Sequence, residues 1–249
     1  MNIKFNIIVP SAGKNTRMQT SKPKSLSKIK DKINLENLFK VFKNYSNKFY
    51  VSISNQEGVL EIYKKNLNAN IFNNIFFAYS TSGSGDGQAI LDTLNSFSVI
   101  KKNKYIIICW GDVYIKNSKT IKTLIDNSSH YLSQFDCIIP LFRTDNPYVN
   151  FIIDKNNKIK KIKFSKRGEF SKKGNSDYGI FFLNSNKIYM YLNKYVTVKK
   201  KNRELNFLDF LLYAQKNFSF KILPLINKKY DIFSYNSKIE LGKINKIKF

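Results

Sequence analysis

Hydrophobic and polar positions follow a pattern that switches repeatedly between strand and helix over the first 145 residues. Short apolar runs such as "YIIICW" are typical of strands buried on both faces, whereas apolar residues three or four positions apart are typical of amphipathic helices. Because the two patterns alternate, we predict a mostly parallel sheet with helices on both faces. The expected strands are Lys4–Pro10, Phe49–Ser54, Asn74–Tyr79, Tyr105–Trp110 and Asp136–Phe142, and the expected helices are Asn34–Lys43, Gln56–Asn66, Gly87–Phe97 and Ser118–Leu132.

The pattern becomes mixed after Pro147. The segment "YVNFIIDKNNKIKKIKF" predicts two strands joined by a turn over Asp154–Lys158. No Pro-rich or Gly-rich linker interrupts the chain, and no hexapeptide repeat is present, so we predict one domain made of two halves, 1–145 and 146–249. Beyond the hairpin we expect strands over Ile180–Leu183 and Phe218–Leu225 and helices over Glu204–Lys216 and Asn236–Ile244.

The composition is typical of a globular protein, since 43% of the 249 residues are hydrophobic. No apolar run approaches the ~20 residues of a membrane helix, and the first residues lack a signal-peptide pattern, so we expect a cytoplasmic location. Cys109 and Cys137 lie in apolar runs and should be buried. His130 is the single histidine and should be exposed, so we expect no mechanism that needs histidine.

The formal net charge is +26, from 43 Lys and Arg against 17 Asp and Glu. A strong positive charge often indicates a nucleic-acid partner. Here, however, lysines are spread along the chain and accompany an excess of Asn, Ile, Phe and Tyr, a bias typical of an AT-rich genome. The charge therefore favours this bias together with a small anionic substrate over a nucleic-acid partner.

A loop of small and basic residues follows the first expected strand, in "IIVPSAGKNTRMQTSKPKSL". Ligands bind after strand ends in open α/β sheets, where backbone N–H groups of a tight loop can hold phosphate oxygens. Gly13 would allow close approach, while Arg17 and Lys24 supply positive charge. The spacing matches neither a Walker loop nor a dinucleotide fingerprint. Taken alone, the stretch is also compatible with an ordinary basic loop.

Two further segments carry candidate chemistry. The glycine-rich "SGSGDGQAI" precedes an expected helix, and it could form a ligand loop or only a turn. In "YIIICWGDVYI", Asp112 follows a buried strand. A carboxylate at the carboxyl end of such a strand is a natural Mg²⁺ ligand, although a capping aspartate would look the same.

The segments Ser11–Met18 and Pro23–Leu26 resemble the pattern A-A-G-x-G-T-R-M followed by P-K-x-L. This pattern is typical of the GT-A-like, Rossmann-type nucleotidyltransferases, which include sugar-1-phosphate uridylyl-, thymidylyl- and cytidylyltransferases. Asn15 replaces the usual glycine, and asparagine tolerates a positive φ better than most residues. The resemblance implies a Rossmann-like sheet with a nucleotide-binding half (1–145) and a smaller, mixed acceptor-binding half (146–249). The C-terminal β-helix domain of the bifunctional acetyltransferase members has no counterpart here.

The resemblance also implies roles for individual residues. Lys24 would contact the α-phosphate of a nucleoside triphosphate and Arg17 the β- and γ-phosphates, both as catalytic residues. Asp86 stands where the family usually has a small polar residue, and its role stays unassigned. The implied nucleotide-binding residues are Ser11, Ala12, Gly13, Lys14, Asn15, Ser82, Gly83, Gly85, Gly87 and Ala89.

Metal and acceptor ligands are implied in the same way. Asp112 would hold Mg²⁺ together with Asp231, for which Asn236 is the alternative because the spacing is ambiguous. On the acceptor side, the matching positions are Lys166, Asp177 and Glu204, of which Glu204 could equally stabilise a helix start.

The implied activity is transfer of a nucleoside monophosphate from a triphosphate to a phosphorylated sugar or head group, with release of pyrophosphate. CTP or UTP is favoured as donor, and surface polysaccharide biosynthesis as the pathway. One alternative is a GT-A glycosyltransferase, although "GDVY" offers one aspartate instead of a D-x-D motif. The other is a basic nucleic-acid-binding protein. The oligomeric state stays open.

Overall fold

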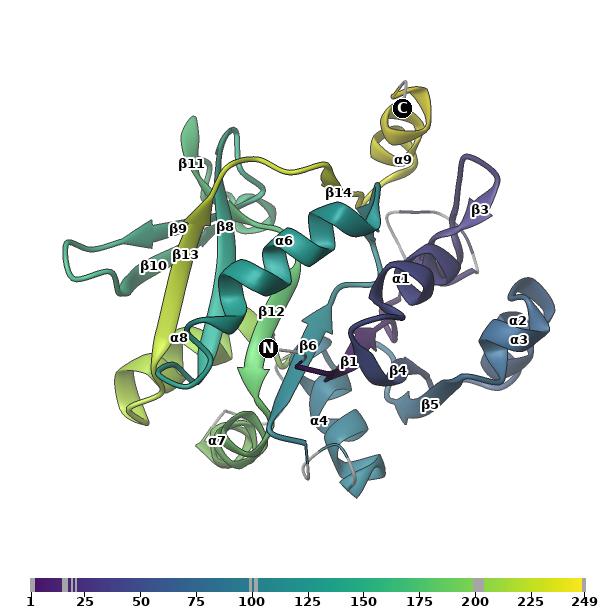
Figure 1. Ribbon diagram of the computed structural model, residues 1–249, viewed down its shortest axis with the longest axis horizontal. Helices are drawn as coiled ribbons and strands as arrows, with labels where there is room; N and C mark the ends of the chain where they lie inside the picture. The colour runs from purple at the N-terminus through teal and green to yellow at the C-terminus, as the bar shows by residue number, and fades with distance from the viewer. Residues whose placement is uncertain are drawn as a thin grey trace.

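The centre of the fold is an eight-stranded sheet in the order β11-β8-β12-β6-β1-β4-β5, with β13 paired to β8 (Figure 1). The structure is a computed structural model that describes residues 3–14, 18, 20, 22–98, 100, 103–198 and 204–247. The strands of this sheet are β1 (Phe5–Pro10), β4 (Ser46–Ser54), β5 (Ile75–Ser80), β6 (Tyr105–Cys109), β8 (Cys137–Asp145), β11 (Lys173–Asp177), β12 (Ile180–Asn184) and β13 (Ile222–Asn227).

Most strands of the sheet run in one direction. β1 pairs in parallel with β4 and β6, and β4 pairs in parallel with β5. β12 is antiparallel to both β6 and β8, so β8 and its parallel partner β13 share the direction of β6. β11 is antiparallel to β8. The predicted mostly parallel sheet is confirmed, and both reversed strands come from the second half, where the sequence pattern becomes mixed.

Helices cover both faces of the sheet, as the fully apolar strands predicted (Figure 1). In β1, Ile7 and Val9 pack into a core with α1, α2 and α6, whereas Ile8 between them packs into a core with α4, α7 and α8. The helices are α1 (Asn34–Phe42), α2 (Val59–Asn66), α3 (Ala69–Phe72), α4 (Asp86–Ser96), α6 (Ser118–Ser129), α7 (Ser185–Val198), α8 (Phe207–Asn217) and α9 (Lys238–Lys246), with 3-10 turns η2 (Lys24–Leu26) and η3 (Ser165–Arg167).

Three small two-stranded sheets border the main one. The predicted hairpin after Pro147 is confirmed as β9 (Val149–Ile153) and β10 (Ile159–Phe164). The pair β7 (Val113–Ile115) and β14 (Ile232–Ser234) joins the chain just after β6 to a segment near its C-terminus. The third pair consists of β2 (Lys28–Ile29) and β3 (Lys32–Ile33).

Several predicted boundaries are wrong. The helix expected over Gln56–Asn66 begins only at Val59, because Gly58 precedes it in a left-handed conformation. The helix expected over Glu204–Lys216 begins at Phe207, since Asn206 is extended and caps it, and residues 204–206 lie in no helix or strand. The strand expected over Phe218–Leu225 begins at Ile222.

The sequence analysis did not predict several of the described elements, among them β2, β3, β7, β14, α3, β11 and α7. β11 has the sequence KGNSD, which contains no large apolar residue, and it is a strand because its backbone pairs with β8. α7 covers the second core through Ile188 and Leu192, but its apolar residues are too widely mixed with polar ones to predict it. The sheet contains strands from both predicted halves, and the boundary at 145/146 stays a prediction.

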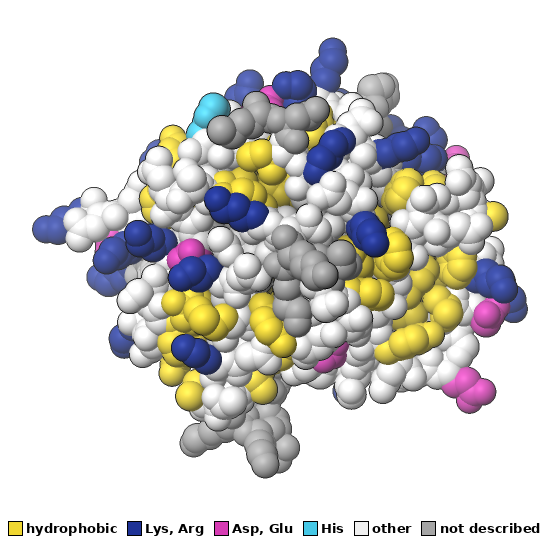
Figure 2. Space-filling model, turned by 60° about the horizontal axis from the view of Figure 1, so that its bottom comes forward, with side chains coloured by type: hydrophobic (Ala, Val, Ile, Leu, Met, Phe, Trp, Pro, Cys, Tyr) yellow, Lys and Arg dark blue, Asp and Glu magenta, His cyan; other side chains and the backbone are white. Residues whose placement is uncertain are grey.

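The surface agrees with the expected placement of single residues. Cys109 and Cys137 are buried and His130 is exposed, as predicted. Figure 2 shows Lys and Arg side chains scattered over one face of the molecule. Among the described residues, no helix combines the length and the hydropathy needed to cross a bilayer.

Candidate active site

A cleft of about 550 Å³ opens where β1 and β6 end. The loops that follow the parallel strands lie at one edge of the sheet, and this edge is the usual ligand site in open α/β folds. The second half supplies the opposite wall through β9, β11 and the segment before α8. The residues that line the cleft are Pro10, Ser11, Ala12, Gly13, Lys14, Lys24, Gly83, Gly85, Asp86, Ala89, Trp110, Gly111, Asp112, Tyr148, Val149, Phe164, Lys166, Ser176, Asp177, Gly179, Glu204, Asn206, Leu208, Ser234 and Asn236.

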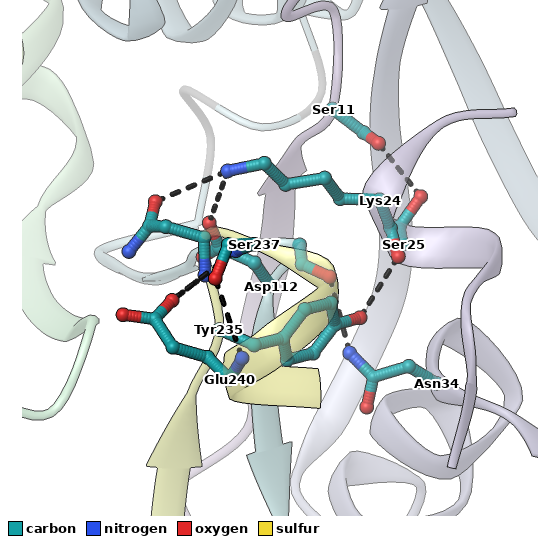
Figure 3. Close-up of polar contacts among 10 residues, drawn as sticks. Ser11, Lys24, Ser25, Asn34, Asp112, Tyr235, Ser237 and Glu240 are labelled. Atoms are coloured by element: carbon teal, nitrogen blue, oxygen red, sulfur yellow. Dashed lines mark hydrogen bonds and ion pairs between the residues drawn. The ribbon is translucent and has the colours of Figure 1, made fainter. Parts of the chain in front are cut away.

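The ammonium group of Lys24 lies between two side-chain oxygens at the cleft wall. Lys24 Nζ is 3.1 Å from Asp112 Oδ2 and 3.1 Å from Asn236 Oδ1, so it donates to both (Figure 3). Tyr235 fixes the backbone of both partners, because its hydroxyl donates to the Lys24 carbonyl and its N–H to the Asp112 carbonyl. The sequence-predicted Lys24 and Asp112 are thus brought together from opposite sides of the first half.

A triangle of hydroxyl groups joins the loop after β1 to the turn that carries Lys24. Ser11 Oγ lies 2.7 Å from Ser25 Oγ, and the Tyr63 hydroxyl lies 2.8 Å from Ser11 Oγ and 3.1 Å from Ser25 Oγ. Tyr63 comes from α2 and is fully buried, and burial raises its pKa to about 12. The three hydroxyls therefore hold the candidate phosphate loop and the candidate catalytic lysine in a fixed relation (Figure 3 shows the Ser11–Ser25 contact).

The register of β7 with β14 decides which C-terminal residue lies near Asp112. Ser234 pairs with Val113, so the chain that follows it, including Asn236, passes beside Asp112. Asp231 lies at the other end of the pair, where its carbonyl accepts from the Lys116 N–H and its carboxylate is 3.3 Å from Lys116 Nζ. Asp231 is absent from the cleft lining and its side chain is 55% exposed, whereas Asn236, the alternative, lines the cleft beside Asp112. The identity of a second metal ligand stays a prediction.

The start of α9 fixes the position of Asn236. Ser237 caps this helix and forms a capping box with Glu240, whose carboxylate also accepts from the Asn236 N–H. The spacing S-x-x-E is a known helix-start signal. The sequence analysis placed the helix start at Asn236, two residues too early, and this signal would have set Asn236 outside the helix.

The residues around Lys24 fit a divalent metal ion. Asp112 and Asn236 aim one oxygen each at a single cationic group, which is the kind of ligand that Mg²⁺ prefers. Within the described part of the chain, no three His, Cys, Asp or Glu side chains cluster as a metal site. Mg²⁺ nevertheless suits a pair of protein oxygens, because it keeps several waters and is often completed by substrate phosphates.

The three candidate acceptor ligands line the opposite side of the cleft. Lys166 belongs to η3, Asp177 ends β11, and Glu204 lies in the segment before α8. Asp177 accepts at Oδ1 from the Gly179 N–H, which lowers its pKa, but burial and, to a smaller extent, the nearby Asp112 carboxylate outweigh this and raise the pKa to about 6. Gly179 is required here, since it has φ +70° and an added Cβ would lie 2.5 Å from Val113.

Only some of the nucleotide-binding residues predicted in the glycine-rich segment line the cleft. Gly83, Gly85 and Ala89 line the cleft, whereas Ser82 and Gly87 do not. Gly83 has φ +79°, a conformation that favours glycine, and the Lys14 side chain passes directly over it, with Cε 2.3 Å from the position of an added Cβ.

Ser11, Ala12, Gly13 and Lys14 line the cleft at the end of β1. The predictions for Asn15 and Arg17 lie outside the described residues.

The sequence analysis missed several residues of the cleft wall. Trp110 follows β6 and packs against Phe181 and Phe207. Tyr148 and Asn206 contribute from the second half. Trp110 stands directly before the recognised Gly111-Asp112 pair, so its position at a strand end could have identified it, whereas Tyr148 and Asn206 carry no local signal.

No family model matches the chain. The bifunctional protein GlmU of Buchnera aphidicola subsp. Schizaphis graminum is 26% identical over 247 residues, which cover 98% of this chain and 50% of that protein. The chain spans about half the length of the curated relatives it matches.

The fold is shared with solved structures at low sequence identity. A nucleoside-diphosphate-sugar pyrophosphorylase from Vibrio cholerae RC9 superposes with a TM-score of 0.73 at 13% identity, covering 97% of this chain and 100% of that one. The inositol-1-phosphate CTP transferase from T. maritima gives a TM-score of 0.71 at 13% identity, covering 98% and 97%. The sequence relatives and the shared fold agree with the resemblance of the motif to the GT-A-like, Rossmann-type nucleotidyltransferases.

Proposed function

We propose that this chain transfers a nucleoside monophosphate from a nucleoside triphosphate to a phosphorylated small-molecule acceptor and releases pyrophosphate. One observation carries the proposal: the Lys24 ammonium lies 3.1 Å from oxygens of both Asp112 and Asn236 in the cleft wall. A triphosphate suits this site, because the Lys24 cation and two side-chain oxygens able to bind a metal ion lie beside the loop of small residues after β1. The reaction is an in-line displacement that needs no covalent intermediate.

The triphosphate would lie along the loop that follows β1. Residues 11–14 line the cleft together with Lys24, and the Ser11 N–H is already donated to the Ser52 carbonyl. The phosphates would therefore meet the backbone of residues 12–14 and the positive charges of Lys14 and Lys24. Arg17 remains a candidate for the β- and γ-phosphates through the motif resemblance. The base and ribose would lie toward Gly83, Gly85 and Ala89 on the same side of the cleft.

Lys24 would stabilise the negative charge that builds on the α-phosphate oxygens. An acceptor phosphate oxygen bonds to the α-phosphorus while the bond to the β-phosphate bridging oxygen breaks, and pyrophosphate leaves with that electron pair. A donor that is already positioned stabilises this charge without reorganising. The Ser11–Ser25–Tyr63 hydroxyls and the Tyr235 hydroxyl hold the Lys24 backbone and its neighbour in place, which supplies that positioning.

Asp112 and Asn236 would hold Mg²⁺, and the match of their oxygens to one cation supports this assignment. When bound, the ion supplies charge neutralisation at the phosphates. Lys24 and the ion would then share two ligands, so a positive charge stays beside Asp112 throughout.

The acceptor would occupy the side formed by the second half. Lys166 can bind the acceptor phosphate, and the carboxylates of Asp177 and Glu204 can accept hydrogen bonds from hydroxyl groups. We extend the proposal to CTP or UTP as the donor and to a sugar or head group destined for surface polysaccharide. A structural neighbour that is a CTP transferase by name supports the choice of a pyrimidine.

The test is a pyrophosphate-release assay with the purified chain. Each of the four ribonucleoside triphosphates and dTTP is incubated with Mg²⁺ and a panel of phosphorylated sugars and head groups, and products are identified by mass spectrometry. Pyrophosphate that appears only with both substrates supports the proposal. Consumption of a nucleotide sugar without pyrophosphate would indicate a glycosyltransferase instead. Binding of RNA or DNA that weakens steeply with salt, with no pyrophosphate, would indicate a nucleic-acid-binding protein.

A further inference from the structure

Asp86, for which the motif resemblance gives no role, joins the N-termini of two helices. It is the first residue of α4, and its Oδ1 accepts from the Gly87 N–H at 2.9 Å and from the Phe207 N–H at 2.7 Å. Phe207 is the first residue of α8. Helix N-termini carry unpaired N–H groups and partial positive charge, so a carboxylate between two of them is well placed.

The backbone around Asp86 lies directly against the segment before α8. The Leu205 N–H donates to the Ser84 carbonyl at 2.8 Å, and the Gly87 N–H donates to the Leu205 carbonyl at 2.8 Å. An added Cβ at Gly85 would lie 2.3 Å from the Leu205 oxygen, and one at Gly87 would lie 2.9 Å from it. These glycines therefore allow the 204–207 segment to approach the loop, in addition to any contact with nucleotide.

The two segments that meet at Asp86 belong to opposite sides of the cleft. Gly83, Gly85 and Ala89 line the proposed nucleotide side. Glu204 and Asn206 line the proposed acceptor side. Phe207 extends this side, because its ring packs edge-on against Trp110 of the cleft wall at 5.7 Å between centroids.

The charges around Asp86 are consistent with a clamp, by which we mean an Asp86 carboxylate that holds residues 83–87 and 204–207 together. Burial raises the pKa of Asp86 to about 6, and the nearby Glu204 carboxylate acts in the same direction. The two N–H donors and Lys166 act against this rise, and they favour the charged carboxylate. The contacts that join the two sides of the cleft therefore help to keep the Asp86 carboxyl group in its charged form.

We infer that Asp86 is a positioning residue that sets the spacing between the nucleotide-side loop (residues 83–87) and the acceptor-side segment (residues 204–207). This inference rests on the proposed function, which assigns the two sides their substrates. Asp86 acts through these two backbones and not as a ligand of either substrate.

The experiment compares Asp86→Ala and Asp86→Asn with Asp92→Asn. Asp92 is a matched control, because it belongs to the same helix, accepts hydrogen bonds from Ser80 and Gln88, and does not line the cleft. For Asp86→Ala we expect KM to rise for both substrates by on the order of tenfold or more, the scale of losing a charge-assisted hydrogen bond. Asp86→Asn should show a smaller rise, since its side-chain oxygen can still accept, and Asp92→Asn should leave both KM values unchanged.

Two outcomes of the KM measurement would overturn the inference. A rise in KM for the triphosphate alone would make Asp86 a direct nucleotide ligand. A fall in Tm with both KM values unchanged would make its role merely structural.

Wild-type protein that releases no pyrophosphate would refute the proposed function. The clamp can be tested separately, by a measurement that does not depend on activity. Amide hydrogen exchange of residues 204–208 should be faster in Asp86→Ala than in Asp92→Asn. Equal exchange in the two variants would refute the clamp whatever the activity.

Discussion

Lys24 Nζ lies 3.1 Å from Oδ2 of Asp112, although 88 positions separate the two residues in the chain. Both side chains are largely withdrawn from water, with 21% and 19% of their surface exposed. A pair in such a place is stabilising only while both partners remain, because removal of one leaves a poorly solvated charge. The pair therefore fixes the lysine in the cleft wall before any substrate arrives.

Replacing Lys24 by alanine should lower kcat/KM by on the order of 100-fold or more, since a positioned cation no longer meets the developing phosphate charge. Lys22→Ala is the matched control, because Lys22 is exposed and pairs with Asn66. Steady-state pyrophosphate release measures both variants, with Tm as the check on folding. Near-normal turnover of Lys24→Ala would refute its assignment.

The two candidate second metal ligands can be separated by mutation. Asp112→Asn and Asn236→Ala should each raise the Mg²⁺ concentration for half-maximal activity by roughly tenfold or more, because each removes or weakens an oxygen ligand of the ion. Asp231→Asn should leave it unchanged, since Asp231 pairs with Lys116 outside the cleft. Calorimetric titration of each variant with Mn²⁺ in the presence of triphosphate gives a readout independent of turnover. An effect of Asp231→Asn equal to that of Asn236→Ala would restore the aspartate as ligand.

Removing the Tyr63 hydroxyl should destabilise the fold by about 1 kcal/mol, because the hydroxyls of the buried Ser25 and the half-buried Ser11 lose a hydrogen-bond partner. Tyr50→Phe is the natural control: its hydroxyl is buried and has no hydrogen-bond partner within the described part of the structure. That change should be neutral or stabilising, since an unsatisfied buried hydroxyl is removed. Urea unfolding of both variants measures the difference. Equal losses of unfolding free energy would show that the triangle does not contribute to stability.

The raised pKa of Asp177 predicts a pH-dependent stability. With a folded pKa of about 6 against a usual value of 3.8, the folded state favours the neutral carboxyl. The contribution of the neutral Asp177 side chain to the free energy of unfolding is therefore fully present below about pH 4, and it is lost as the pH rises through about 6. Asp177→Asn should gain on the order of 2 kcal/mol of unfolding free energy over wild type at pH 7.5, and less than half of that at pH 4.5. A gain of the same size at both pH values would contradict the raised pKa.

The sequence by itself determined most of the large strands and helices and the cleft-lining residues that follow β1 and β6. The alternation of apolar strands and amphipathic helices is a property of neighbouring residues, so the order of elements could be predicted without knowing their partners. The loop after β1 and Asp112 after β6 follow from the same pattern, because the carboxyl ends of parallel strands meet at one edge. Burial of Cys109 and Cys137 also followed from their apolar runs.

Only the tertiary structure decided how distant segments combine. The choice of Asn236 over Asp231 depends on the register between β7 and β14, and nothing near either residue encodes it. The position of Asp86 depends in the same way on the approach of residues 204–207, 121 positions from Asp86 in the case of Phe207. Strand and helix periodicity is local, whereas pairing between remote segments is set by the packing of the whole core. The sequence pattern therefore located the cleft-lining residues of the first half but not the residues of the second half that lie beside them.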